Sequence, residues 1–257
     1  MTEGGTLTGK VALVTGSSSG TGAAIALELA RQGAAVAVHC RSRMDDAETI
    51  ARRIVEAGGR AKAFRADLAH DSATQALAGE VVGALGPVQI LVNNAGPFAD
   101  APFGTLRPET WDAVMAANLK APYLLTQALA PGMERAGWGR IVNIGATSGF
   151  VRSHSVYGLA KAALLTLTES LALELAPNVT VNAVVPSQIA SARTDTMPAY
   201  KEAAIAGTPL GRLVTEEEIA RVVALVCSTE LAFMTGRSIV LDGGRTLPRF
   251  PRIGISD

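Results

Sequence analysis

Short apolar runs alternate with longer helical patterns along most of the chain, and this alternation limits the fold more than any other feature. The first run, residues 11–14, leads into a glycine-rich turn and a helical pattern that ends at Gly33. Further strands are predicted at residues 36–38, 61–65, 88–92, 140–144, 179–185 and 239–241. Helices are predicted before Gly58, at residues 108–118, 123–135 and 155–175, and after the capping box at Thr215. Nearly continuous apolar strands between helices predict an α/β fold, a doubly wound (Rossmann) parallel sheet with helices on both faces.

The length of the chain and its even composition predict one domain. The 257 residues, 48% of them hydrophobic, suffice for one large core. No linker, repeat or low-complexity stretch divides them, so residues 1–257 are expected to form a single domain. Residues 187–212 interrupt the regular alternation, because they are long, mixed and weakly periodic. Segments of that kind often close over substrates, so a substrate lid is expected there.

Charge and hydropathy argue against several classes of partner. The formal net charge is zero, and no basic stripe suggests a nucleic acid partner. Residues 1–8 have no hydrophobic signal core, and no apolar run approaches the length of a membrane span, so we expect a soluble, cytoplasmic protein with no membrane partner. Cys40 and Cys227 lie in apolar surroundings, which favours buried reduced thiols over a disulfide, and no metal site is predicted.

A glycine-rich turn, Thr15-Gly16-Ser17-Ser18-Ser19-Gly20-Thr21-Gly22, joins the first strand to the first helix. Glycines allow a tight turn and a close approach of the backbone to a pyrophosphate, and the helix N-terminus supplies free N–H groups and a positive dipole. The strand–turn–helix context favours a dinucleotide site over a purely structural turn. The residues expected to bind the cofactor here are Gly16, Ser18, Ser19, Gly20, Thr21 and Gly22.

The end of the second strand indicates which nicotinamide cofactor is used. Sites for NAD usually place an acid there to bind the ribose 2′-hydroxyl. Residues 38–43 contain no carboxylate, but they include Arg41, Ser42 and Arg43. Arginine suits the 2′-phosphate of NADP through a charge-assisted contact. NADP(H) is therefore expected, with Arg41 and Ser42 at the phosphate; the alternative is that both arginines are solvated loop charges.

Tyr157 and Lys161 stand four residues apart, on one face of a predicted helix. The unperturbed pKa of a phenol is about 10, and a nearby cation favours the phenolate and lowers that pKa. The pair is therefore expected to form a proton donor and acceptor that works near neutrality. The spacing alone is weak evidence, since any long helix can carry it by chance.

Together, these motifs resemble the classical short-chain dehydrogenase/reductase family over nearly the whole chain. The glycine turn matches the family's, with Thr21 in place of the usual isoleucine, and Tyr157 and Lys161 match its catalytic pair. The other matching positions are Asp67 and Leu68 at the adenine, Asn94, Ala95 and Gly96 along the cofactor, Asn118 in the proton relay, Pro186 and Ile189 near the nicotinamide, and the Leu241-Asp242-Gly243-Gly244 ending. Taken singly, Asn118 is also an ordinary polar helix residue, and Asp67 an ordinary helix N-cap.

The resemblance implies a hydride transfer to a small-molecule substrate. NADPH would deliver hydride to a carbonyl carbon while Tyr157 donates a proton to its oxygen. Lys161 would lower the pKa of Tyr157 and bind the nicotinamide ribose, and Asn118 would hold a water that replenishes the proton. The family commonly forms tetramers through the helices that match residues 123–135 and 155–175, so a homotetramer or homodimer is expected.

One position departs from the family. A serine that hydrogen-bonds the substrate carbonyl usually follows the fifth strand, and here Ala146 stands in its place. Losing one such donor costs on the order of a hundredfold or more in rate. Thr147 and Ser148 follow at once, and the loop to Tyr157 is about two residues shorter than is common in the family. Ser148 is therefore a candidate for the missing role; the alternative is that it only caps the loop.

Three functions follow from these residues. The leading one is NADPH-dependent reduction of a carbonyl, as in 3-oxoacyl reductases. The second is reduction of a C=N or C=C bond, and residues 39–42, 195–198 and 227–228 lean towards the pteridine-reductase-like branch. The third is a non-enzymatic protein that senses NADP(H), supported only by Ala146.

Residues near the lid are candidates for a substrate pocket. Phe98, Phe103, Phe150, Met197 and Tyr200 would line an apolar pocket or else belong to the core or an interface. His154 precedes Tyr157 and is expected to be a solvated loop residue rather than a substrate contact, and the tail at residues 245–257 is expected to reach a neighbouring subunit.

Overall fold

A seven-stranded parallel sheet forms the centre of the protein in a computed structural model, which describes residues 5–151 and 155–248. The strands are β1 (Val11–Val14), β2 (Ala35–Cys40), β3 (Ala61–Arg65), β4 (Ile90–Asn93), β5 (Gly139–Ile144), β6 (Val179–Pro186) and β9 (Ser238–Leu241). Their order is β3-β2-β1-β4-β5-β6-β9, so the winding reverses between β1 and β4. This order confirms the predicted doubly wound fold.

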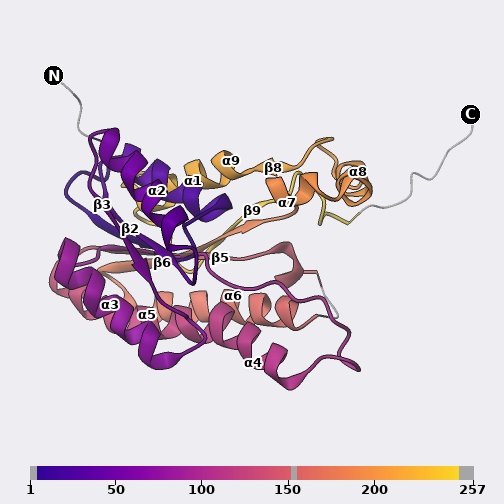
Figure 1. The fold of residues 1–257 in the computed structure, drawn as a ribbon, viewed down its shortest axis with the longest axis horizontal. Helices are drawn as coiled ribbons and strands as arrows, with labels where there is room; N and C mark the ends of the chain where they lie inside the picture. Colours follow the sequence, from indigo (N-terminus) through magenta and orange to yellow (C-terminus); the bar gives the residue numbers. More distant parts are fainter. Residues whose placement is uncertain (1–4, 152–154, 249–257) are drawn as a thin grey trace, which may run out of the picture.

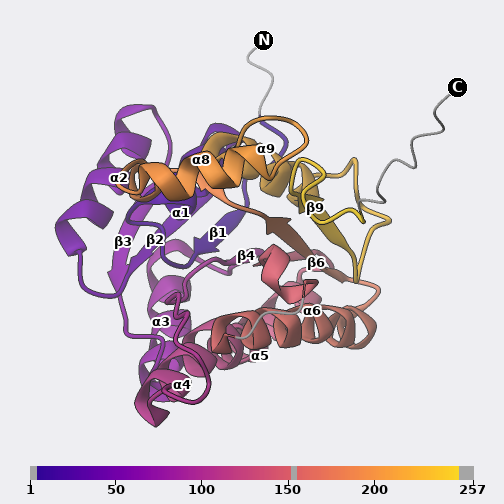
Figure 2. The same cartoon turned by 90° about the vertical axis from the view of Figure 1, so that its right-hand side faces the viewer.

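Helices cover both faces of the sheet, as Figures 1 and 2 show. One face carries α1 (Gly20–Arg31), α2 (Met44–Glu56) and α9 (Glu216–Cys227), and the other carries α3 (Asp71–Leu85), α5 (Ala121–Arg135) and α6 (Val156–Leu175). Strand β1 shows how the sequence builds these layers. Its alternate residues Ala12 and Val14 lie in the first core, whereas Val11 and Leu13 lie in the second. Every residue of the strand is therefore buried, as its unbroken apolar run predicts.

Two helical features depart from the prediction. Helix α3 was not predicted from the sequence, because it is rich in small residues and has only a narrow apolar stripe, which includes Leu77 and Val81. The helix α4 (Pro108–Met115) passes into α5 through a π-helical turn, η1 (Ala116–Lys120), instead of ending at a loop. Such wide turns occur frequently at functional sites, and η1 contains Asn118.

The segment at residues 187–212 is more regular than expected. It contains β7 (Ile189–Ala190), α7 (Ala192–Asp195) and α8 (Pro198–Ala206), and β7 pairs with β8 (Val214–Thr215) as a separate two-stranded sheet. The helices are too short for their periodicity to show in the sequence. They lie beyond one end of the main sheet (Figure 1), and α8 is on the side that carries α9 (Figure 2).

Both cysteines are buried and free, as predicted. The expectation about apolar runs was wrong for α6, because this 20-residue helix is long and apolar enough to cross a membrane by length and composition, with a mean hydropathy of 1.3. Half of that stretch is buried inside the protein, where α6 packs against the sheet. His154 and residues 249–257 lie outside the described residues.

Candidate active site

The predicted site residues gather where the parallel strands end. Thr15 follows β1, Asn94 follows β4 and Ala146 follows β5, so the three lie along the same edge of the sheet. In doubly wound sheets, ligands bind at this edge, where the winding reverses. The reversal lies between β1 and β4, so the glycine turn and Asn94 face one another at that point.

The glycine turn is tight enough to require its glycines. Gly16 and Gly20 have φ angles of 64° and 58°, which favour glycine, and a Cβ on Gly22 would stand 2.2 Å from the carbonyl oxygen of Gly16. Asn94 Nδ2 donates to the carbonyl oxygens of Thr15 and Gly16, at 3.0 and 3.2 Å. The helix α1 begins at Gly20 without a side-chain cap on its first N–H groups. Ser18 and Thr21 are half-buried, and Ser19 and Gly20 are exposed.

His39 supports the turn from β2, and sequence analysis missed this role. Its Nδ1 accepts from the Gly16 N–H at 3.0 Å, and its Nε2 lies 3.0 Å from the carbonyl oxygen of Ala66. Burial lowers the pKa of His39 to about 4, so the ring is neutral near pH 7, with Nε2 carrying the proton. The contact joins residues 23 apart in sequence, and nothing in the local pattern reveals it.

The residues expected at the adenosine end lie after β2 and β3. Arg41 and Ser42 are exposed, and Arg41 has no ion pair among the described residues. Arg43 contacts Ser19 of the glycine turn and pairs with Asp46 at 3.2 Å, so of these two arginines Arg41 is the one without an ion pair in the described part of the chain. Leu68 is buried.

Asp67 is not a helix N-cap. The N-cap of α3 is His70, and Asp67 Oδ1 accepts from the Ala69 N–H at 3.0 Å within a short turn before the helix. The alternative that Asp67 is an ordinary helix N-cap was therefore wrong.

Tyr157 and Lys161 lie one turn apart near the start of α6, as the spacing predicted. Lys161 Nζ donates to the carbonyl oxygen of Ile144 at 2.7 Å and lies 5.5 Å from the centre of the Tyr157 ring. Burial lowers the pKa of Lys161 to about 8. The expected lowering of the Tyr157 pKa is wrong for this structure, because burial raises it to about 12 and the opposing cation is Arg193, not Lys161. Tyr157 therefore holds its proton at neutral pH.

Asn118 is held inside the π-helical turn. Its Nδ2 donates to the carbonyl oxygens of Pro97 and Val114, at 3.1 and 3.0 Å. Its Oδ1 is buried and has no hydrogen-bond partner among the described residues. Because an unpaired buried acceptor is costly, this oxygen is suited to a water molecule or a ligand group. Gly96 packs so closely that a Cβ there would meet Asn118 Oδ1 at 2.1 Å.

The loop after β5 places Ser148 beside α6, the helix that carries Tyr157 and Lys161. Ala146 caps a short 3₁₀ turn, η2 (Thr147–Gly149), and a Cβ on Gly149 would lie 3.1 Å from the backbone of Lys161. The Ser148 Oγ is buried and lacks a hydrogen-bond partner among the described residues. It therefore does not cap the loop.

Two amide side chains tie the strand ends to α6, and sequence analysis missed this contact. Asn93 Nδ2 donates to Asn143 Oδ1 at 2.8 Å, and Asn143 Nδ2 donates to Thr168 Oγ1 at 2.9 Å. All three side chains are buried. The available signal was an asparagine in each of two mainly apolar strands, β4 and β5.

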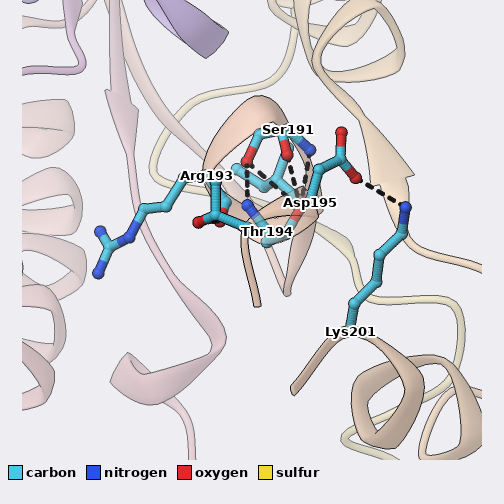
Figure 3. Close-up of polar contacts among 7 residues, drawn as sticks. Ser191, Arg193, Thr194, Asp195 and Lys201 are labelled. Atoms are coloured by element: carbon cyan, nitrogen blue, oxygen red, sulfur yellow. Dashed lines mark hydrogen bonds and ion pairs between the residues drawn. The ribbon is translucent and has the colours of Figure 1, made fainter. Parts of the chain in front are cut away.

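Next to the glycine turn and α6, the edge of the sheet continues at Pro186, the buried end of β6, and at Ile189 in β7. The carbonyl oxygen of Ile189 accepts from Thr194 Oγ1 at 3.0 Å, which ties α7 to this strand. Figure 3 shows α7 with Arg193 pointing away from the Asp195–Lys201 ion pair. Tyr157, Ala95, Gly96 and α7 thus lie around the same edge of the sheet. Among residues 5–151 and 155–248, no group of three or more acidic, histidine or cysteine side chains could hold a metal ion.

A doubly wound sheet with a glycine turn at its reversal point and a Tyr–Lys pair on a neighbouring helix defines a dinucleotide-dependent oxidoreductase. The chain belongs to the short-chain dehydrogenase/reductase family, as a family model described as enoyl-(acyl carrier protein) reductase matches residues 16–246. It is 41% identical over 242 residues to nodulation protein G of Rhizobium sp. (strain N33), covering 93% of this chain and 97% of that protein. It is 39% identical over 242 residues to the 3-oxoacyl-[acyl-carrier-protein] reductase FabG of Pseudomonas aeruginosa, covering 93% and 98%.

Solved structures agree with this assignment. A gluconate 5-dehydrogenase from Burkholderia cenocepacia, in complex with NADP and tartrate, matches with a TM-score of 0.88 and 30% identity, covering 95% of this chain and 97% of that one. A short-chain dehydrogenase/reductase from Serratia marcescens matches with a TM-score of 0.89 and 36% identity, covering 93% and 99%.

Proposed function

We propose that this oxidoreductase uses NADPH to reduce a carbonyl group of a small-molecule substrate, with Tyr157 as the proton donor. The observation that carries the proposal is the protonated, half-buried phenol of Tyr157 beside the Lys161 cation, at the edge of the sheet where the glycine turn lies. A phenol that holds its proton at neutral pH suits the reductive direction. The relatives named as reductases and dehydrogenases support an enzyme over the alternative of a non-enzymatic sensor.

The residues present fit NADP(H). The Gly22 position leaves no room for a Cβ, and the uncapped start of α1 offers N–H groups to a pyrophosphate. When bound, the cofactor supplies the hydride. The positions proposed to hold it are Gly16, Ser18, Ser19, Gly20, Thr21, Gly22, Arg41, Ser42, Asp67, Leu68, Asn94, Ala95, Gly96, Tyr157, Lys161, Pro186 and Ile189.

The chain's own groups then move one proton. Tyr157 donates its proton to the carbonyl oxygen and is left as the phenolate, while Lys161 is proposed to bind the nicotinamide ribose. The unpaired Asn118 Oδ1 would hold a water molecule from which the proton is restored. We further propose that residues 1–257 act as one domain, with residues 187–212 as the lid. The homo-oligomer and the cytoplasmic location stay predictions. The exposed apolar side chains Tyr123, Leu159 and Leu173 on α5 and α6 support the homo-oligomer.

Arg41→Ala is expected to weaken NADPH selectively. Loss of a charge-assisted phosphate contact costs about 1.5–3 kcal/mol, so KM for NADPH should rise roughly ten- to hundredfold. NADH lacks the 2′-phosphate and serves as the internal control, with its KM nearly unchanged. Steady-state rates with both cofactors measure the effect. Equal changes for NADPH and NADH would show that Arg41 does not read the phosphate.

Ser148→Ala is expected to lower kcat by roughly a hundredfold if Ser148 supplies the donor that Ala146 lacks. The buried, unpaired hydroxyl of Ser148 supports this role. Thr147→Val, one residue away, is the matched control and should leave kcat nearly unchanged. An unchanged turnover number in Ser148→Ala would show that Ser148 does not donate to the substrate carbonyl. A large loss of kcat in Thr147→Val would indicate that Thr147 is the donor instead.

Reduction of a C=C or C=N bond is the second candidate function. Ala146 favours it, because such a reaction needs no serine at a carbonyl oxygen, and the matching family model is described as an enoyl-(acyl carrier protein) reductase. NADPH oxidation with simple ketones, 3-oxoacyl thioesters, enoyl thioesters and dihydropterins separates the two. Turnover confined to enoyl thioesters or dihydropterins would replace the carbonyl proposal, and binding of NADPH without any turnover would contradict both.

A further inference from the structure

We infer that Arg193 binds an anionic group of the substrate, a carboxylate or a phosphate, while Tyr157 acts on the carbonyl several bonds away. This inference rests on the proposed function and specifies its substrate class. The arginine lies on α7 in the lid, and no motif in the sequence marks it.

The backbone of α7 is fixed by a dense set of hydrogen bonds, so the position of Arg193 is defined. Ser191 and Thr194 form a capping box, with the Ser191 N–H donating to Thr194 Oγ1 at 2.9 Å. Thr194 Oγ1 also donates to the carbonyl oxygen of Ile189 at 3.0 Å, and its side chain is buried. Figure 3 shows these contacts at one side of the short helix, with the Arg193 side chain extending from the other.

The charge of Arg193 is not neutralised by its neighbours. The adjacent acid, Asp195, accepts from Lys201 Nζ at 2.7 Å instead (Figure 3). Arg193 is exposed and forms no ion pair with any carboxylate in residues 5–151 and 155–248. The Asp195–Lys201 pair thus holds a competing acid away from the guanidinium and leaves a cation that faces the site.

Phe98 connects this cation to Tyr157. The Arg193 Cζ lies 5.3 Å from the centre of the Phe98 ring, and the Phe98 ring lies 5.1 Å from the Tyr157 ring in an edge-on arrangement. Tyr157 senses the charge, since Arg193 is the group that opposes the effect of burial on its pKa. Together, these two distances set an upper limit for the separation between Arg193 Cζ and the centre of the Tyr157 ring.

A guanidinium over the face of an aromatic ring makes no hydrogen bond to that ring, so its N–H groups stay available to a ligand. That planar fork matches the oxygens of a carboxylate or a phosphate, which it binds in a bidentate manner. Phe98 is 51% exposed, so its ring offers an apolar surface between the anion-binding group and the proton donor. A substrate with a carbonyl at one end, a short apolar stretch and an anion at the other fits this arrangement.

The test compares each anionic substrate with its neutral counterpart in Arg193→Gln. The pairs are a keto acid with its methyl ester, and a 3-oxoacyl coenzyme A thioester with the same N-acetylcysteamine thioester. We expect kcat/KM for the anionic member to fall about ten- to hundredfold, with little change for the neutral member. A loss confined to the keto acid pair would show that Arg193 binds a carboxylate. A loss confined to the thioester pair would show that Arg193 binds the phosphates of coenzyme A.

Two further variants keep the test decisive. Arg193→Lys retains the positive charge but not the planar guanidinium, so it should recover part of the preference for the anionic substrate. This variant replaces Arg193→Gln in the test if Arg193→Gln does not fold. Arg135→Gln removes an exposed arginine at the end of α5 that precedes β5, at the opposite edge of the sheet, and should change neither ratio. Turnover with an anion preference that Arg193→Gln leaves intact would overturn this inference alone, whereas no NADPH oxidation with any substrate would overturn the proposed function as well.

Discussion

Tyr157→Phe is expected to reduce kcat by roughly 10²- to 10⁴-fold, the usual contribution of a positioned general acid. The substitution removes only the hydroxyl, so the ring contact with Phe98 and the Lys161–Ile144 hydrogen bond should persist. Steady-state NADPH oxidation with the best substrate of the panel measures the loss.

The control for this variant is its affinity for NADPH, measured by fluorescence titration, which should stay within a few-fold of that of the native protein. A variant that binds NADPH normally and turns over at the native rate would contradict the role of Tyr157. A variant that no longer binds NADPH would indicate a structural effect instead.

Gly22→Ala is the second large effect, and it acts on stability and cofactor binding together. The new Cβ would stand 2.2 Å from the Gly16 carbonyl oxygen and 2.6 Å from Asn94 Nδ2, so the glycine turn must shift. Overpacking of this kind costs about 1–3 kcal/mol in the free energy of unfolding. Because the displaced turn is the proposed pyrophosphate site, the Kd for NADPH should rise as well.

Gly79→Ala provides the matched control for Gly22→Ala. Gly79 lies within α3, and a Cβ there would meet nothing within 4 Å. Alanine in a helix interior is favoured over glycine by about 0.5–1 kcal/mol, so this variant should be slightly more stable and should bind NADPH normally. Urea unfolding and NADPH titration compare the two. Equal effects of both substitutions would show that the tight packing of Gly22 is unimportant.

The sequence predicted the features that short stretches of chain encode. Short, mainly apolar runs predicted β1 and the other strands of the main sheet, because residues buried on both faces of a parallel sheet are mostly apolar. The glycine turn was predicted because φ angles like that of Gly16 restrict the choice of residue. The spacing of Tyr157 and Lys161 placed both on one helix face, as found.

Features that depend on distant contacts could not be predicted. The hydrogen bond from the Gly16 N–H to His39 joins the turn after β1 to β2, and the contact of Arg193 with Phe98 joins α7 to the loop after β4. The π-helical turn around Asn118 adds a residue to a helix without any local marker. The predicted direction of the Tyr157 pKa shift was wrong because burial of the phenol raises the pKa more than the nearby charge lowers it. Burial depends on the packed structure and cannot be derived from the spacing of two residues.

The most direct measurement of the central claim is the transfer of label from NADPH deuterated at the nicotinamide C4, with each face labelled in turn. The product of the best carbonyl substrate is analysed by mass spectrometry and NMR. We predict one deuterium on the new carbinol carbon from one of the two labelled faces, at a rate that falls in Tyr157→Phe. Consumption of NADPH with no deuterium on that carbon would contradict hydride transfer to a carbonyl at this site.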